Sequence, residues 1–138
     1  MKDILSRKRR LEEGTVELTE QCSAIIQNRI PAKLKDPGSF VLPCEIGEVI
    51  HSKALVDLGS SINLMPYSFC RKLGIIGLTE TRMFLQLADR SIKKPKGIVE
   101  DLLVKVGAFI FPAYFVILDM DGEVDIPIIF GRPFLNTT

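Results

Sequence analysis

One aspartate in this chain follows an apolar run and opens a glycine turn. Asp57 comes directly after the apolar residues 54–56, and it is followed by Leu58, Gly59 and Ser60. A buried strand of this kind would anchor its last residue, the glycine permits a tight turn, and the serine hydroxyl can hydrogen-bond the carboxylate. A carboxylate held in this way is half of a site that could activate water for peptide hydrolysis.

The chemistry of that half requires a second carboxylate beside it. One group takes a proton from water while the other protonates the carbonyl oxygen of the peptide bond. Like charges a few ångströms apart cannot both ionise, so the pair shares a proton and titrates as a unit. Taken alone, the string D-x-G-S favours a structural turn, because Asp and Gly are common turn residues.

The elements that would position Asp57 have the pattern of strands. From residue 39 onward, short apolar stretches are separated by Gly, Pro and Asp, which is typical of an all-β domain. Gly47-Glu48 predicts a tight hairpin, and a helix is predicted between Pro66 and Gly74. The expected strands cover residues 40–46, 49–56, 83–88, 98–106, 109–112, 114–118 and 126–130.

The first 35 residues differ in composition from the rest. We expect a linker that lies outside the core and carries one short helix, capped by Thr19, with Cys22, Ile25 and Ile26 at helical spacing. Four basic residues at 7–10 fit a nuclear-localisation or RNA-contacting patch, but a solvated linker is the simpler interpretation. Residues 36–138 would then form a single domain.

Four stretches of that domain resemble the retropepsin family, the aspartic proteases of retroviruses and long-terminal-repeat retrotransposons. The similarity is closest to plant Ty3/gypsy-type polyproteins and extends over residues 36–135. It is carried by KDPGSF at 35–40, LVDLGSSINLMP at 55–66, LQLADRS at 85–91 and IIFGRPFL at 128–135. The resemblance implies an all-β fold of the acid-protease type: a small closed barrel half with one or two short helices.

The resemblance also implies roles for particular residues. Asp57 would be the catalytic aspartate, residues 128–135 would pack behind it, and residues 86–97 would be a mobile hairpin that covers a polypeptide substrate. Family members carry one motif per chain and work as homodimers with the site on the two-fold axis. This chain would then be the protease module of a retrotransposon polyprotein and would cleave that polyprotein. The hairpin residues expected to contact the substrate are Leu87, Ala88, Asp89 and Arg90.

Two departures from the family pattern leave a second function open. The residue after the aspartate is usually Thr or Ser, whose hydroxyl bonds to the partner chain, but here it is Leu58. Losing two symmetric hydrogen bonds, each worth about 0.5–1.5 kcal/mol, would loosen the dimer. The chain also ends at Thr138, before the family's terminal strand, so we expect a truncated domain. The alternative function is a catalytically weakened or inactive binding or dimerisation module derived from a protease, including a domesticated cellular gene product.

Other groupings of polar residues carry less chemistry. The acidic residues within 119–125 lack the full pattern of a calcium loop and fit a solvated turn. His51 is the only histidine and has no serine or cysteine partner pattern. Lys93, Lys94 and Lys96 fit a solvated loop tip, because no aromatic residues are interleaved with them. We therefore expect neither a metal nor a cofactor.

Composition indicates which partners and which cellular compartment to expect. With 18 basic and 17 acidic residues the net charge is +1, which gives no reason to expect a nucleic acid or a membrane as partner. No apolar run approaches the roughly 20 residues that cross a bilayer. Cys22, Cys44 and Cys70 lack C-x-x-C spacing, which favours reduced thiols. We expect an intracellular and most simply a cytoplasmic protein.

Overall fold

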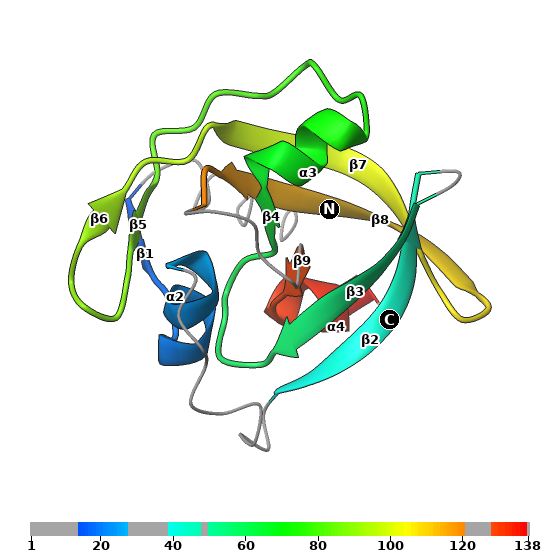
Figure 1. The fold of residues 1–138 in the computed structure, drawn as a ribbon, viewed down its shortest axis with the longest axis horizontal. Helices are drawn as coiled ribbons and strands as arrows, with labels where there is room; N and C mark the ends of the chain where they lie inside the picture. The colour runs from blue at the N-terminus through cyan, green and yellow to red at the C-terminus, as the bar shows by residue number, and fades with distance from the viewer. Residues whose placement is uncertain (1–13, 28–38, 48–49, 121–127, 138) are drawn as a thin grey trace.

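Six strands of the chain close into a barrel (Figure 1). The computed structural model describes residues 14–27, 39–47, 50–120 and 128–137. The strands follow the order β2-β3-β9-β4-β8-β7, and β2 pairs with β7 to close the ring. The barrel and its few short helices confirm the prediction of an all-β fold. The barrel strands are β2 (Ser39–Ile46), β3 (Ile50–Asp57), β4 (Leu64–Pro66), β7 (Gly97–Val106), β8 (Phe109–Leu118) and β9 (Ile128–Phe130).

The longest strands of the barrel, β7 and β8, pair across a turn at Gly107, whose φ is +60°. We predicted two strands here, at residues 109–112 and 114–118, but β8 runs continuously through Pro112. Among the described strands, β4 reaches β8 only from Val116 onward. Proline is tolerated in a strand where one side needs no hydrogen-bond donor.

Several barrel strands are buried on both of their faces, among them residues 54–57 of β3 and all three residues of β4 and of β9. In β3, Ala54 and Val56 contribute to a cluster inside the barrel, whereas Leu55 contributes to a second cluster outside it. In β9, Phe130 belongs to the inner cluster and Ile129 to the outer one. Side chains along a strand alternate between its two faces. The outer face of these strands therefore needs an apolar cover.

We call the two clusters the barrel core and the site core. The barrel core consists of Cys44, Ile46, Ala54, Val56, Met65, Phe69, Cys70, Val99, Val104, Phe111, Ala113, Phe115, Ile117, Ile128, Phe130 and Phe134. The site core consists of Leu18, Cys22, Ile25, Ile26, Leu55, Ile62, Leu64, Met83, Leu85, Leu87, Ile98, Val116, Leu118 and Ile129.

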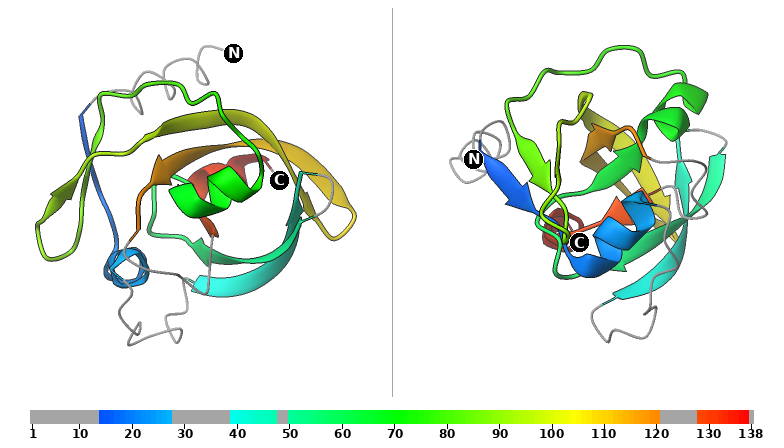
Figure 2. Two further views of the ribbon diagram at one scale, coloured as in Figure 1. Left: turned by 45° about the horizontal axis from the view of Figure 1, so that its top comes forward. Right: turned by 60° about the vertical axis from the view of Figure 1, so that its left-hand side comes forward.

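The N-terminal segment, residues 14–27, supplies the apolar cover. As predicted, Thr19 caps its helix, and its Oγ1 accepts a hydrogen bond from the Cys22 N–H at 3.0 Å. Figures 1 and 2 show this segment beside a small hairpin on one side of the barrel. The segment consists of β1 (Thr15–Glu17) and α2 (Glu20–Ile26), and the hairpin consists of β5 (Phe84–Gln86) and β6 (Ile92–Lys93).

The prediction that residues 1–35 lie outside the core is wrong for the part that the structure describes. Leu18, Cys22, Ile25 and Ile26 are each at most 7% exposed and belong to the site core. The three in α2 share one helix face because of their spacing, and that face covers apolar side chains on the outside of the barrel. The N-terminal segment is therefore part of the folded unit.

Two further short helices complete the described fold. α3 (Tyr67–Lys72) begins directly after Pro66 and ends before Gly74, which has a φ of +75°, as predicted. α4 (Arg132–Thr137) follows β9. Within the described ranges, none of the helices has the length and apolar character needed to cross a membrane.

Candidate active site

Asp57 is the last residue of β3, a strand held on both sides. β2 pairs with β3 in an antiparallel register, and β9 pairs with it in parallel from Ala54↔Ile128 to Val56↔Phe130. The three residues before the aspartate are fully buried. Asp57 itself is 5% exposed, so the strand delivers its carboxylate to a fixed and largely enclosed position.

The residues after Asp57 form the predicted tight turn. The Gly59 N–H donates to Asp57 Oδ1 at 3.0 Å, and the Ser60 N–H donates to the Asp57 carbonyl oxygen at 3.0 Å. Leu58, at the tip of the turn, is 38% exposed. The backbone of the turn thus orients one oxygen of the carboxylate, and an apolar side chain projects where the resemblance would place a hydroxyl.

The hydroxyl that contacts the carboxylate is not the predicted one. Ser60 Oγ donates to the Ile62 carbonyl oxygen at 2.8 Å and accepts from the Ile62 N–H at 3.4 Å, so this side chain closes the next turn. Thr19 Oγ1 donates to Asp57 Oδ2 at 2.5 Å. The sequence marks Thr19 as a helix cap, but 38 residues separate it from Asp57, and no local pattern reports such a contact.

The glycine after β9 fits closely behind the aspartate turn. Its N–H donates to Asn63 Oδ1 at 2.9 Å, and a Cβ added to Gly131 would lie 2.3 Å from the Ile62 carbonyl oxygen and 2.6 Å from that of Ser60. The Arg132 N–H donates to the same Ser60 oxygen at 2.8 Å. The stretch 128–135 was predicted to pack behind the aspartate, and the contacts of its described residues agree with that prediction.

The predicted substrate-covering hairpin is present as β5, β6 and the turn between them. Leu87 is 2% exposed and belongs to the site core, whereas Ala88, Asp89 and Arg90 are exposed. Arg90 has a φ of +72°, which is unusual for a residue other than glycine and marks a sharp turn. α2 and its N-cap link the Asp57 turn to the hairpin tip, because Thr19 bonds to Asp57 and Ser23 accepts from the Ala88 N–H.

The thiol nearest the carboxylate is kept neutral. Burial raises the pKa of Cys22, and the charge of Asp57 raises it further. A neutral buried thiol is a poor nucleophile. Among the described residues, no three acidic, cysteine or histidine side chains gather in a way that could hold a metal ion. Residues 121–127 of the acidic loop and the side chain of His51 lie outside the described part.

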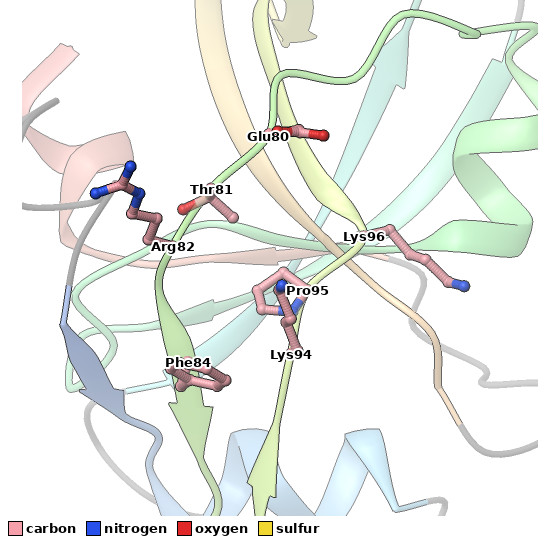
Figure 3. A pocket seen from close by; sticks show the side chains of 7 residues that line it. All are labelled: Glu80, Thr81, Arg82, Phe84, Lys94, Pro95 and Lys96. Atoms are coloured by element: carbon pink, nitrogen blue, oxygen red, sulfur yellow. The ribbon is translucent and has the colours of Figure 1, made fainter.

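Two of the three lysines predicted at a loop tip, Lys94 and Lys96, line an open pocket that does not include Asp57, whereas Lys93 is the last residue of β6. In Figure 3 the ends of Arg82 and Lys96 point away from each other, so these cations do not converge on one ligand. Lys96 Nζ instead lies 5.4 Å from the centroid of the Tyr67 ring. The pocket is lined by Glu80, Thr81, Arg82, Phe84, Lys94, Pro95 and Lys96.

Two solved structures are similar to this chain. The retroviral protease-like domain of Ddi1 from Leishmania major has a TM-score of 0.50 and 23% identity, covering 70% of this chain and 69% of that chain. A retropepsin-like aspartic protease from Rickettsia conorii has a TM-score of 0.49 and 22% identity, covering 74% and 73%. No curated protein matches the sequence.

The first of these likenesses shows a retropepsin-like fold. A family model described as aspartyl protease matches residues 42–134, which include the Asp57 turn, the hairpin and Gly131. The N-terminal segment lies outside that match. Because the model covers most of the sequence, this chain belongs to the aspartyl protease family.

Proposed function

We propose that this chain is an aspartic endopeptidase module whose catalytic site forms when two copies bring their Asp57 turns together. The observation that carries the proposal is the fixed carboxylate at the end of β3, with one oxygen held by the Gly59 N–H. A single chain provides one such strand and turn, and a lone carboxylate cannot act as acid and base at once. The second carboxylate would come from an isologous partner.

The mechanism of the pair follows from its shared proton. The ionised Asp57 would accept a proton from a water held between the two turns, while the protonated partner would donate to the peptide carbonyl oxygen. Gly59 would keep each carboxylate in place through its N–H. The β5–β6 hairpin would cover the peptide and exclude bulk water, which strengthens electrostatic interactions at the site.

The proposed substrate is a polypeptide, specifically the retrotransposon polyprotein of which this chain would be a part. The plant Ty3/gypsy-type motifs in the sequence support that origin. We further propose an intracellular, cytoplasmic setting. Its support is that Cys22, Cys44 and Cys70 are free thiols, which fits a reducing compartment.

The test combines peptidase activity with oligomeric state. The chain is incubated with its own polyprotein segment, and products are identified by mass spectrometry while sedimentation velocity measures the dimer. We expect cleavage that rises with the dimer fraction and is abolished by Asp57→Asn. Cleavage by Asp57→Asn at the wild-type rate would overturn the proposal, as would cleavage by a strict monomer.

A second candidate function is a binding or dimerisation module without hydrolysis. Two observations favour it: Leu58 exposes an apolar side chain on the turn, and Thr19 already donates to Asp57. Leu58→Thr would restore the hydroxyl that the family uses, and Leu58→Val is the matched control without it. Higher activity in Leu58→Thr alone indicates a weakened enzyme, whereas no activity in any variant indicates the binding module.

A further inference from the structure

We infer that the N-terminal segment, residues 14–27, occupies the place of a peptide substrate between the Asp57 turn and the β5–β6 hairpin, which we call the peptide groove, so that the structure is a self-occupied form. This inference rests on the proposed function for the identity of the groove. It predicts that a peptide substrate or a second copy must displace the segment before Asp57 can act. Three separate sets of contacts support it.

The first set lies along the hairpin, where the segment binds as an added strand. β1 pairs with β5 in parallel, from Thr15↔Phe84 to Glu17↔Gln86. The Leu18 N–H continues the ladder by donating to the Gln86 carbonyl oxygen at 2.8 Å. Addition of an extended segment to the edge of a sheet is a general mode of peptide binding. The hairpin thus holds the segment as it would hold a substrate.

The second set lies at the hairpin tip, among the residues predicted to contact substrate. The Ala88 N–H donates to Ser23 Oγ at 2.8 Å, and Gln27 Nε2 donates to Asp89 Oδ2 at 2.9 Å. Both partners of the tip belong to α2 or directly follow it. The hairpin is therefore closed over a segment of its own chain.

The third set lies at the aspartate. Thr19 Oγ1 donates to Asp57 Oδ2, and the Gly59 N–H donates to Oδ1. A Cβ added to Gly59 would lie only 2.8 Å from the Thr19 Cγ2 methyl, so Thr19 sits directly on the turn. With Asp57 at 5% exposure, a water and a second carboxylate cannot both reach it until Thr19 leaves.

The apolar contacts of the segment define the class of peptide that would replace it. Leu18, Cys22, Ile25 and Ile26 fill one side of the site core, facing aliphatic side chains of the barrel and the hairpin. Displacement of the segment would uncover this aliphatic surface, and an incoming peptide would have to cover it again. The preferred occupant is therefore a peptide with aliphatic side chains.

The first test uses hydrogen exchange of the wild-type chain, resolved by peptide mass spectrometry. We expect residues 14–27 and the Ala88 amide to exchange together, at least about 10-fold faster than the paired amides of β7 and β8, because the segment can open while the barrel stays closed. Exchange of all these amides at one common rate would overturn the inference, since the segment would then leave only on global unfolding.

The second test uses a fluorescent peptide with the sequence of residues 14–27, added in trans. Binding to the wild-type chain should be weak, because the tethered copy competes at an effective concentration near the millimolar range. Leu18→Asp weakens the tethered copy, and we expect the peptide to bind at least about 10-fold more tightly to this variant by fluorescence anisotropy.

Matched controls separate groove binding from nonspecific adhesion. Leu103→Asp makes the same change at a residue that is 55% exposed on β7, and it should bind the peptide no better than wild type. A peptide carrying the Leu18→Asp change should not bind to either variant. Equal binding by wild type and a folded Leu18→Asp variant would overturn the inference; if that variant does not fold, the exchange test still decides.

Neither readout requires hydrolysis, so the two proposals can fail separately. Independent opening of the segment and peptide binding, without cleavage by any variant, would support self-occupation and refute the protease. Cleavage by the wild type that Leu18→Asp leaves unchanged would support the protease and refute self-occupation. If both are correct, Leu18→Asp should cleave faster than wild type at equal dimer concentration.

Discussion

The barrel core and the site core of this protein are built from different side chains. In the barrel core, the Phe130 ring contacts those of Phe111, Phe115 and Phe134, with centroids 4.5–6.5 Å apart. The buried members of the site core are aliphatic residues, one cysteine and one methionine. Interlocked rings give contacts beyond simple area burial, so the two clusters should differ in how they come apart.

The clusters also differ in what they join. The barrel core joins strands of a closed ring to one another and to α3 and α4. The site core joins that ring to the N-terminal segment and the hairpin. A cluster between a closed barrel and an added segment can part while the barrel stays intact. The candidate active site thus lies at the interface that can separate while the barrel stays closed.

The largest expected effect comes from cutting one large side chain out of each core. Phe130→Ala should lower the free energy of unfolding by about 3–5 kcal/mol, as buried Phe→Ala changes do. Ile26→Ala weakens only the docking of the N-terminal segment. Its effect on the free energy of unfolding should therefore not exceed the docking free energy, because further weakening has no effect once the segment has left the barrel. Urea unfolding and hydrogen exchange of the β7 and β8 amides measure the effect of each substitution. If Ile26→Ala lowered the protection of the β7 and β8 amides as much as Phe130→Ala does, the two cores would not separate independently.

A smaller effect should follow from adding one methyl group at either side of the aspartate turn. Gly131→Ala places a Cβ against two backbone carbonyl oxygens of the barrel, and we expect a loss of about 1–3 kcal/mol or more. Gly59→Ala places its Cβ against Thr19 of the segment, so we expect local release of α2 and a loss below about 1 kcal/mol in barrel stability.

Chemical denaturation measures the global loss for both glycine variants, and exchange of the α2 amides measures the local one. We expect Gly59→Ala to raise exchange in α2 while its unfolding midpoint stays near that of wild type. A larger global loss in Gly59→Ala than in Gly131→Ala would contradict it.

The smallest effect concerns pH, because each core buries a thiol. Burial raises the pKa of Cys44 from 9.0 to about 11. Between these values the unfolded thiol has lost its proton and the folded one retains it, so the unfolded state binds fewer protons. Stability contributed by Cys44 is then complete below pH 9 and is lost as the pH rises from 9 toward 11.

The measurement is urea unfolding of the wild type and of Cys44→Ala from pH 8 to pH 11. In Cys44→Ala, the free energy of unfolding should decrease less steeply with pH. Cys22 makes the contrasting case, since its pKa is raised by burial and then by the charge of Asp57. Alkaline pH should therefore release α2 before it unfolds the barrel. Circular dichroism follows the unfolding of the barrel, and exchange of the α2 amides follows the release of α2. If the two occurred at the same pH, this order would be contradicted.

Much of the fold could be predicted because local chemistry decides it. Thr19 and Gly74 mark helix ends through capping and positive φ, and both predictions are confirmed. The turn at Asp57 was also readable, since it needs only a short apolar run and a glycine. These features depend on neighbours in sequence.

The position of the N-terminal segment could not be predicted in the same way. The unbroken apolar runs at 54–56 and 128–130 indicate strands buried on both faces, so they signal that something must cover the outer face. They do not say which segment does so. The Thr19–Asp57 hydrogen bond follows from that docking, which joins residues far apart in the chain. Ser60 bonds locally to Ile62, but the string D-x-G-S does not say whether its hydroxyl meets the carboxylate or the next turn.

The placement of Cys22 gives the molecule a built-in chemical reporter. Its thiol is fully buried against the aspartate turn as long as α2 is seated, and an alkylating reagent attacks only an accessible thiolate. Each excursion of the helix into solvent would expose this sulfur, whereas Cys44 and Cys70 stay within the barrel core. The ratio of their alkylation rates would measure how often the helix opens, without any mutation or substrate.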